Sequence, residues 1–299
     1  MSDSLRRGAI LIVIAELLLA TMAATIKAAS AELPSEMLVF FRNLFGLVLL
    51  LPLLVQGGLQ GLATRVPHLH LLRGLAGVGA MYCFFWTIAH MPLAEALLVK
   101  LTAPFFLPLI AWLWLRESLS GRAVLAIAIG FVGVFFILQP NGAMQAAPLQ
   151  VGAVGLAGAA LAALAKVTIR RMGPQESSRR VVFWFGVVAT LVSALPLPWV
   201  WQTPSAQALL LLLVLGACAT SAQLLLTRAF AMAPSGRLGP FTYVSVVFGS
   251  LYGWWIWGEV LGPLTLLGMA LVIGAGLLNL LRPRPAPAAA DPKPVEERP

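Results

Sequence analysis

Long apolar stretches follow one another along almost the whole chain, and this feature most limits how the chain can fold. A helix needs about 20 apolar residues to cross a hydrocarbon core about 30 Å thick. Only 10% of the 299 residues are charged, against about 25% in a soluble domain. The sequence therefore predicts an all-α integral membrane protein with ten transmembrane helices, at residues 8–29, 36–55, 69–89, 92–115, 122–139, 149–170, 179–200, 206–232, 236–258 and 262–281.

The N-terminal segment also fits a second interpretation. Arg6 and Arg7, the apolar run after them and the small residues 29–31 imitate a secretory signal with its cleavage site. Glu16 interrupts this run, and 22 residues is long for the core of a signal. We therefore interpret residues 8–29 as the first transmembrane helix.

Basic residues are distributed unevenly between the two sides of the predicted membrane. With the N-terminus in the cytoplasm, 16 of the 20 Lys and Arg residues fall in cytoplasmic segments or at adjoining helix ends, Arg73 among them. The outer loops hold none. This positive-inside bias places both termini in the cytoplasm. It also accounts for the net charge of +9 without a nucleic-acid partner.

The sequence shows no motif for catalysis, a cofactor or a metal. It has no GxxxxGK[ST] loop for nucleotide phosphates, and no Asp between Ser4 and Ala290. The three His residues are too loosely spaced for a metal site. Cys83 and Cys218 fall inside apolar spans, where we interpret them as small hydrophobic residues. We therefore expect no enzyme activity, no cofactor and no metal.

The two halves of the chain are related in sequence. At an offset of 142 residues they share the pairs Gly74/Gly216, Ala89/Ala231, Pro92/Pro234, Phe106/Phe248, Trp112/Trp254, Glu117/Glu259, Leu119/Leu261 and Leu138/Leu280. The first two helices of each half match weakly and need about one more residue of offset. We therefore predict two five-helix repeats, 8–139 and 149–281, followed by a disordered Pro-rich cytoplasmic tail at 282–299.

The number of spans in each repeat determines how the repeats are oriented. Five spans is an odd number, so the second repeat enters the membrane from the opposite side. Inverted repeats are a signature of secondary transporters, so the sequence predicts transport by alternating access. The spans at 122–139 and 262–281 carry few polar side chains. We expect these two at the edge, with the other eight around a cavity.

Charged residues inside the spans are candidates for the cavity, because a charge at mid-bilayer costs about 2.5–3.5 kcal/mol on insertion scales. Glu16 and Lys27 share one face of the first helix, and we assign Glu16 to the cavity. Lys27 fits either a cavity contact or an ammonium that reaches the outer interface. Lys100 is a candidate for holding an anion, whereas we expect water to solvate Glu95 near the outer boundary.

Polar and aromatic residues supply the remaining candidates. Tyr82, Trp86 and His90 form one stripe of the third helix, which fits an aromatic wall for a ligand as well as helix packing with an interfacial belt. The other predicted cavity residues are Thr102, Gln223, Thr242, Tyr243 and Ser245. Because Pro frees a backbone carbonyl and bends helices, the predicted hinges are Pro104, Pro108, Gly239 and Pro240.

One longer pattern resembles a known family. Residues 101–138, LTAPFFLPLIAWLWLRESLSGRAVLAIAIGFVGVFFIL, place a Pro after a small-residue turn, an acidic residue at a loop and then a Gly-spaced helix. Residues 258–278 are a second copy. The chain thereby resembles the ten-helix EamA type of the drug/metabolite transporter superfamily over about 8–281. Pro104 matches the family Pro, whereas Val246 stands at the corresponding position of the second half. The resemblance implies a small-molecule transporter of the bacterial cytoplasmic (inner) membrane.

Within that superfamily the chain is similar to the bacterial aromatic amino acid exporters, which implies efflux of neutral amino acids, including aromatic ones. Lys100 or Lys27 would then hold the carboxylate, Glu16 the ammonium group or a coupling proton, and Tyr82 and Trp86 a ring. Two alternatives stay open, namely a multidrug or other metabolite transporter of the same fold and a non-transporting structural or regulatory membrane protein. The expected partners are a small-molecule substrate and the lipid bilayer, with the protein a monomer or weak homodimer.

Overall fold

The computed structural model describes residues 3–55, 62–138, 149–173, 176–232 and 238–280, and within these ranges the chain contains helices and no strand. The predicted tail at 282–299 lies outside the described residues. The helices are α1 (Asp3–Ala29), α2 (Ser35–Val55), α3 (Pro67–His90), α4 (Leu93–Lys100), α5 (Ala103–Leu115), α6 (Gly121–Leu138), α7 (Leu149–Met172), α8 (Ser178–Ala194), α9 (Leu197–Val200), α10 (Ala206–Met232), η3 (Gly239–Tyr243), α12 (Val244–Trp257) and α13 (Pro263–Leu280).

Each predicted span coincides with one helix or with two consecutive short ones. The fourth span divides into α4 and α5, the seventh into α8 and α9, and the ninth begins with the 3-10 helix η3. Among the described segments, six are long and apolar enough to cross a membrane: α1, α3, α4 together with α5, α6, α7 and α10. The structure confirms the all-α fold, while the count of ten spans stays a prediction.

Prolines mark the interruption of the predicted fourth span. Pro104 occupies the second position of α5 and has no N–H to donate to the carbonyl of Lys100. The chain turns there, and the Thr102 hydroxyl donates to the Val99 carbonyl at 2.6 Å. Pro108 lies inside α5. Discontinuous helices of this kind line the substrate sites of many secondary transporters.

The second half has a comparable interruption. Gly239 and Pro240 begin η3, a 3-10 segment that leads directly into α12. Both predicted hinge pairs therefore lie at or near a change of helix geometry, and their bending during transport stays a prediction.

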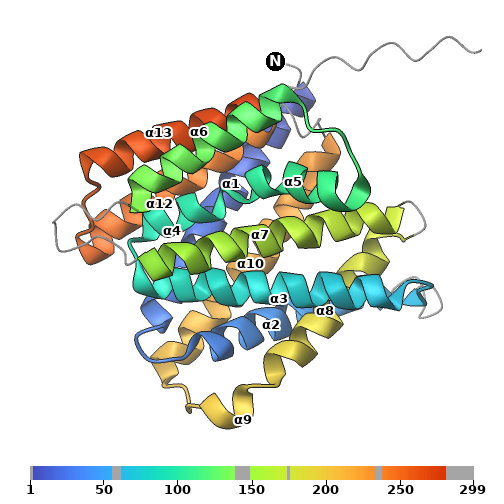
Figure 1. Cartoon of the computed structure of the whole chain (residues 1–299). Coiled ribbons are helices and arrows are strands. Elements are labelled where there is room, and N and C mark those ends of the chain that lie inside the picture. Colours follow the sequence, from blue (N-terminus) through green and yellow to red (C-terminus); the bar gives the residue numbers. More distant parts are fainter. Residues whose placement is uncertain (1–2, 56–61, 139–148, 174–175, 233–237, 281–299) are drawn as a thin grey trace, which may run out of the picture.

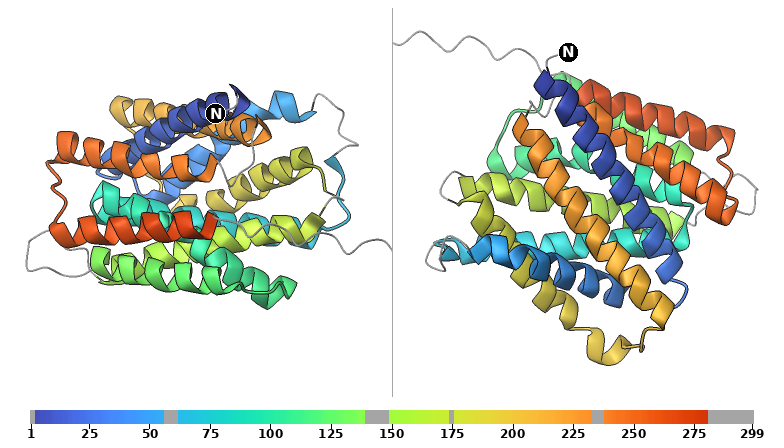
Figure 2. Two further views of the ribbon diagram at one scale, coloured as in Figure 1. Left: turned by 90° about the horizontal axis from the view of Figure 1, so that it is seen from above. Right: turned by 180° about the vertical axis from the view of Figure 1, so that it is seen from behind.

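Helices from opposite halves pack in matching pairs. α1 runs along α10, and α7 runs along α3 (Figure 2). At the offset of 142 residues, α1 corresponds to α7 and α3 to α10. The pair α1–α10 in the structure therefore corresponds to the pair α7–α3. α2 packs on its own counterpart α8, and α6 on its counterpart α13. A twofold relation between the predicted repeats would produce this pattern of pairs.

α6 and α13 lie side by side at one edge of the molecule, where their few polar side chains led us to expect them (Figure 1). Glycines let the two backbones approach closely. A Cβ on Gly133 would lie 2.8 Å from the carbonyl oxygen of Gly268, and one on Gly268 would lie 2.5 Å from that of Gly133. Ala126 and Ala275 are buried on the same two helices. Small residues at such crossings are typical of helices that associate in lipid.

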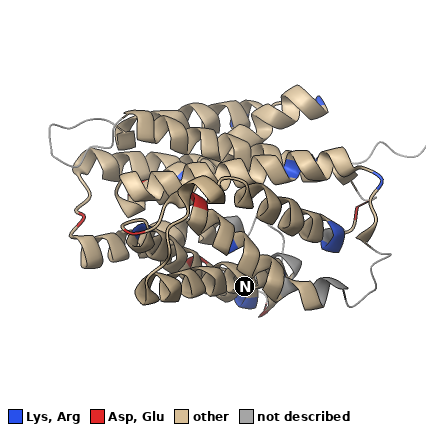
Figure 3. Cartoon of the chain, turned by 90° about the horizontal axis from the view of Figure 1, so that it is seen from below, with Lys and Arg blue, Asp and Glu red and all other residues tan. Residues whose placement is uncertain are grey.

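Few charged residues interrupt the helices (Figure 3). Large apolar side chains point outward instead, and examples are Leu113, which is 71% exposed, and Trp255, which is 77% exposed. An outward apolar surface of this kind suits contact with lipid tails, which are apolar themselves. The helices also satisfy the second condition for a membrane, because their backbone polar groups are hydrogen-bonded within each helix.

We expect Gly268→Ala to destabilise the protein by about 1–3 kcal/mol, because the added Cβ would come within 2.5 Å of the Gly133 carbonyl oxygen. Gly274→Ala on the same helix is the matched control, since a Cβ there meets nothing within 4 Å and Ala favours helix over Gly. Thermal unfolding in detergent measures both variants. Equal losses of stability would contradict the α6–α13 crossing.

Candidate functional site

A cavity of about 320 Å³ opens between α2, α3, α4, α7, α8 and α10. Small-molecule sites commonly have volumes of about 300–1,000 Å³. Much of the wall consists of small residues from α3 and α7, together with the rings of Phe84 and Phe185. The cationic side chains that line the cavity are Arg42 of α2, Arg73 of α3, Lys100 of α4 and Lys166 of α7.

These four cations lie near one another rather than beside carboxylates. Among the described residues, none of them has a carboxylate oxygen within 4.0 Å. Lys100 is repelled by the charges of both Lys166 and Arg42, and Arg73 is repelled by Arg42. Among the described residues that line the cavity, basic side chains therefore outnumber acidic ones.

Aromatic rings support two of the cations. The guanidinium carbon of Arg73 lies 3.7 Å from the ring centroid of Phe185, and the Lys100 Nζ lies 4.7 Å from that of Phe84. A cation over a ring face gains about 0.5–2 kcal/mol. These contacts orient the two side chains but do not neutralise them, and the buried Nε of Arg73 has no hydrogen-bond partner.

Glu16 brings a carboxyl group close to this cluster. It is 5% exposed on α1, and its charge interacts with that of Lys100. Ser245 lies beside Glu16, and its hydroxyl donates to the carbonyl of Thr242 at 2.8 Å. The structure thus brings together four of the cavity candidates that the sequence identified, namely Glu16, Lys100, Thr242 and Ser245.

Lys27 lies at the end of α1 and pairs with the carboxylate of Glu259. Its Nζ also donates to the Met91 carbonyl at 2.9 Å and lies 5.4 Å from the ring centroid of Trp257. Glu259 accepts a further hydrogen bond from the N–H of Leu93 at 2.8 Å. These contacts tie α1 to α4 and to the α12–α13 loop. They replace both earlier interpretations of Lys27, as a cavity residue and as an ammonium at the interface.

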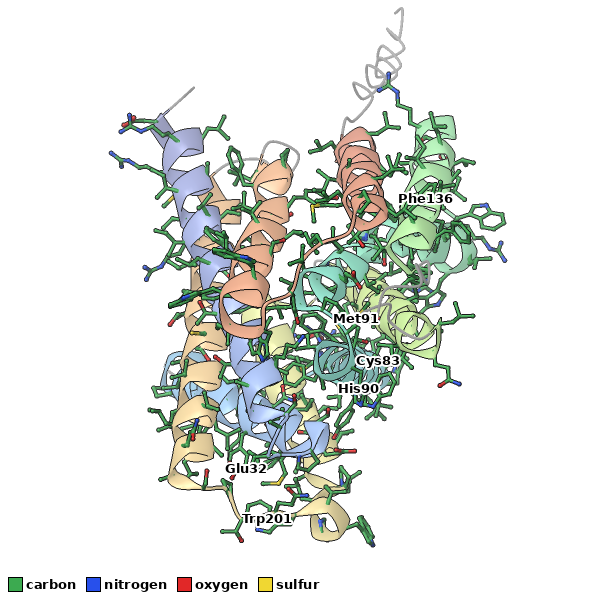
Figure 4. All side chains as sticks on the ribbon, turned by 90° about the vertical axis from the view of Figure 1, so that its left-hand side faces the viewer. Glu32, Cys83, His90, Met91, Phe136 and Trp201 are labelled. Atoms are coloured by element: carbon green, nitrogen blue, oxygen red, sulfur yellow. The ribbon has the colours of Figure 1, made fainter. Side chains whose placement is uncertain are left out.

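The aromatic stripe of α3 does not line the cationic cavity. Tyr82 and Trp86 border a separate hollow together with Glu36 and Pro196. His90 stacks on Trp86 at a centroid distance of 4.2 Å, and its Nδ1 lies 2.7 Å from the Trp86 carbonyl oxygen. Figure 4 shows His90 near the end of α3, close to Met91. An aromatic wall around the cations is therefore not formed by this stripe.

The remaining predicted residues divide between the cavity and helix packing. Gln223 lines the cavity, whereas Thr102 is fully buried at the α4–α5 interruption and Tyr243 is buried against α13. The expectation that water solvates Glu95 is wrong, because Glu95 is 7% exposed. It accepts a hydrogen bond from Thr265 of α13 at 3.3 Å, and α13 covers this part of α4.

A second ion pair occupies the place that the repeat assigns to the first. Arg170 NH2 lies 2.5 Å from Glu117 Oε1. Glu117 corresponds to Glu259 at the offset of 142, and Lys27 corresponds to Arg170 at an offset of 143. The Lys27–Glu259 side chains are only 14% and 12% exposed, whereas those of Arg170 and Glu117 are 47% and 42% exposed. Related residues thus form both pairs, in unequal surroundings.

The same type of helix end presents the acid in each half. α5 ends at Arg116 with φ 57°, and α12 ends at Gly258 with φ 66°. The N–H of the following residue, Glu117 or Glu259, bonds back to a carbonyl in the last turns of its helix, at 3.3 and 3.0 Å respectively. A residue in the left-handed conformation thus closes each of the two helices. Each cap places the carboxylate directly beside the end of its helix.

Glu32 and Glu176 form another matched set at the loops. Glu32 accepts hydrogen bonds from the N–H and the hydroxyl of Ser205, each at 2.8 Å, and Figure 4 shows it near the same end of the molecule as Trp201. Glu176 accepts from the Thr64 hydroxyl at 3.0 Å. The first contact joins the α1–α2 loop to the start of α10, and the second joins the α7–α8 loop to the segment before α3. Hydrogen bonds therefore also connect the ends of the packed helix pairs α1–α10 and α3–α7.

Residues 6–139 and 151–281 each match the model of the EamA-like transporter family. The chain belongs to this family. A pseudopaline exporter of Pseudomonas aeruginosa is 34% identical over 277 residues, which cover 91% of this chain and 95% of that protein. An S-adenosylmethionine uptake transporter of Rickettsia bellii is 29% identical over 238 residues, with coverages of 80% and 81%.

A solved crystal structure shares the fold of this EamA-family chain. It has a TM-score of 0.63 at 20% sequence identity and covers 90% of this chain and 95% of its own. Family membership confirms the resemblance to the drug/metabolite transporter superfamily and makes the chain a multi-pass membrane protein of a family that moves small metabolites.

Sequence reasoning missed three of the four cavity cations of this EamA-family protein. Arg42 and Lys166 are basic residues inside predicted spans, which is the same signal that identified Lys100. The charge pattern assigns Arg73 to a cytoplasmic helix end, although it lies well inside α3. The cost of a charge in an apolar span, applied to every basic residue, would have found the complete set.

We expect the stabilising contribution of Glu176 to disappear in acid. Burial raises the pKa of this carboxyl, but hydrogen bonds from Thr64, His70 and Arg180 and the charge of Arg180 lower it further, so its pKa lies below the ordinary value. Ionised Glu176 therefore stabilises the fold above its unfolded pKa of about 4.3, and this contribution is lost as the pH falls through the lower folded pKa. Glu176→Gln should lower the melting temperature at pH 7 and lower it less below pH ~4. A pH-independent difference would contradict the assignment.

Proposed function

We propose that this EamA-family protein exports small carboxylate-bearing metabolites, amino acids and their derivatives, by alternating access. The observation that carries the proposal is the occurrence of two related ion pairs, Lys27–Glu259 and Arg170–Glu117. Inverted repeats place corresponding residues on opposite sides of a membrane. The two pairs would then close opposite ends of a single path.

The unequal burial of the two pairs supports a direction of access. With both termini in the cytoplasm, Lys27–Glu259 lies at the outer end of the path and Arg170–Glu117 at the inner end. The outer pair is largely buried and has further backbone partners, whereas the inner pair is nearly half exposed. This conformation is closed more tightly toward the outside, so cargo would enter the cavity from the cytoplasm.

The lining of the cavity supports a cargo with a carboxylate. Guanidinium and ammonium groups bind carboxylates through short charge-assisted hydrogen bonds, and the cavity provides Arg42, Arg73, Lys100 and Lys166. The Pseudomonas aeruginosa relative is named as an exporter, which supports export, although the Rickettsia bellii relative is named for uptake. Export of neutral and aromatic amino acids, which the resemblance implies, stays a prediction within this class.

The membrane placement and energy coupling complete the proposal. We place the protein in the bacterial cytoplasmic (inner) membrane with both termini in the cytoplasm, as the positive-inside bias predicts. The charge of Glu16 interacts with that of Lys100, which lines the cavity, and we assign to Glu16 either the coupling proton or the ammonium group of the cargo. No enzymatic step and no cofactor is part of this function.

Reconstitution in proteoliposomes tests transport and its coupling. We expect labelled amino acids, acidic ones included, to cross faster than in empty liposomes, and a pH gradient to change the rate. Glu16→Gln should remove the dependence on pH, because no titrating carboxyl then faces Lys100. Flux equal to that of empty liposomes for a panel of neutral and acidic amino acids would overturn the proposal.

The two ion pairs should differ in their contribution to stability. Removing one partner of a buried pair costs about 3–5 kcal/mol, whereas exposed pairs contribute about 0–1 kcal/mol. Glu259→Gln should therefore lower the thermal stability far more than Glu117→Gln, its counterpart in the other repeat. The charge exchange Lys27→Glu with Glu259→Lys should recover part of the loss. Equal losses of thermal stability for the two Gln variants would show that the two ion pairs close the two ends of the path equally tightly, contrary to the proposal.

A further inference from the structure

We infer that the cavity between α2, α3, α4 and α7 binds a small organic anion with two or more acidic groups, held by Arg42, Arg73, Lys100 and Lys166. The inference rests on the proposed function for the movement of this anion across the membrane. The binding itself depends only on the charge and shape of the cavity.

Basic side chains dominate the charged groups of the cavity. The cavity is lined by four cations, and Glu16 is the carboxyl that interacts with Lys100. With every group ionised, three positive charges are left without a balancing negative charge. Uncompensated charge in a poorly hydrated interior is costly. A zwitterionic amino acid has no net charge and leaves this excess in place, whereas a dicarboxylate or tricarboxylate offsets two or three charges.

Several buried donors near the cavity lack hydrogen-bond partners. The Arg73 Nε, the Asn43 Nδ2 and the Thr220 Oγ1 are buried and form no hydrogen bond. Asn43 is only 2% exposed. All three residues line a pocket that shares Arg42 and Arg73 with the main cavity. Buried polar groups are nearly always hydrogen-bonded, so these donors are suited to acceptor oxygens of a ligand.

The four cations come from four different helices around the cavity. Arg42 and Arg73 lie on the side shared with the adjoining pocket, and Lys100 and Lys166 are supplied by α4 and α7. One carboxylate offers about four acceptor sites, fewer than the donors that two guanidinium and two ammonium groups provide. Two or more acidic groups on one molecule can engage both sides of the cavity at once.

The apolar part of the wall determines what joins those acidic groups. Phe84 and Phe185 present rings to the cavity, and small residues of α3 and α7 leave space between them. The cavity volume of about 320 Å³ is more than a single inorganic ion needs. An organic skeleton is therefore favoured over a bare phosphate or sulfate ion.

Binding to the purified full-length protein in detergent tests the inference. Calorimetric titration would compare citrate, succinate, inorganic phosphate and phenylalanine at one ionic strength. We expect citrate to bind more tightly than succinate, phenylalanine and phosphate to bind at least tenfold more weakly than citrate, and citrate affinity to fall as salt is added. Phenylalanine or phosphate binding as tightly as citrate would overturn the inference.

Variants of the cations supply the second test. Arg73→Gln and Lys166→Gln should each weaken citrate binding by about tenfold or more, since hydrogen bonds to charged groups are strong. Arg122→Gln is the matched control, because Arg122 is exposed at the start of α6 and does not line the cavity. It should bind citrate like the wild type. Citrate affinities of both cavity variants equal to that of the control would overturn the inference.

The stability of the ligand-free protein separates binding from a structural role. Removing Lys166 relieves its repulsion of Lys100, so the melting temperature of Lys166→Gln without ligand should stay the same or rise. A lower melting temperature with unchanged citrate affinity would show that the cation is structural and would overturn the inference.

The two proposals fail in different ways. Citrate binding that depends on these cations, without any flux in proteoliposomes, would support this site and refute the transport function. Flux of phenylalanine without citrate binding would support transport and refute the anion site.

Discussion

The structure depends on the cost of placing a charge among apolar helices. The chain deals with this cost in two ways. Lys27 is matched by a carboxylate and a backbone carbonyl, and the result is a closed contact between helices. Lys100 and Arg73 rest against aromatic rings, and among the described residues neither has a carboxylate oxygen within 4.0 Å. Charges of the first kind hold helices together, whereas those of the second kind leave a cavity ready for a ligand of opposite sign.

Sequence duplication determines where these charges lie. The matches between the halves include an acid that follows a helix cap, Glu117 or Glu259, and a base near the end of a helix, Lys27 or Arg170. In the structure each acid pairs with the base of the other half. Because α1 packs along α10 and α7 along α3, each half completes the other. The cavity lies among helices of both halves, so a shift of one helix pair against the other changes the cavity as well as its two ends.

The fold could be predicted from sequence because apolar length and charge bias act over whole segments. Packing partners of single side chains could not be predicted in the same way. Lys27 and Glu259 are separated by most of the chain, and Glu95 is covered by a helix far along the sequence. Arg73 lies near the predicted cytoplasmic surface by its position in α3, yet it faces the cavity because α8 packs against that side of α3. Local patterns give the depth of a residue in a helix, and only the assembled helices give the direction it faces.

The two caps that present Glu117 and Glu259 have the same backbone shape but different residues. Gly258 adopts its left-handed conformation freely, whereas Arg116 adopts it at a cost of about 1–2 kcal/mol for a residue with a side chain. Any rearrangement that releases the turn after α5 recovers this energy, and release of the turn after α12 recovers none. An energy of about 1 kcal/mol corresponds to roughly a fivefold change in an equilibrium. A duplicated pair of turns can thus acquire a preference for loosening at one end through a single side chain that contacts no cargo.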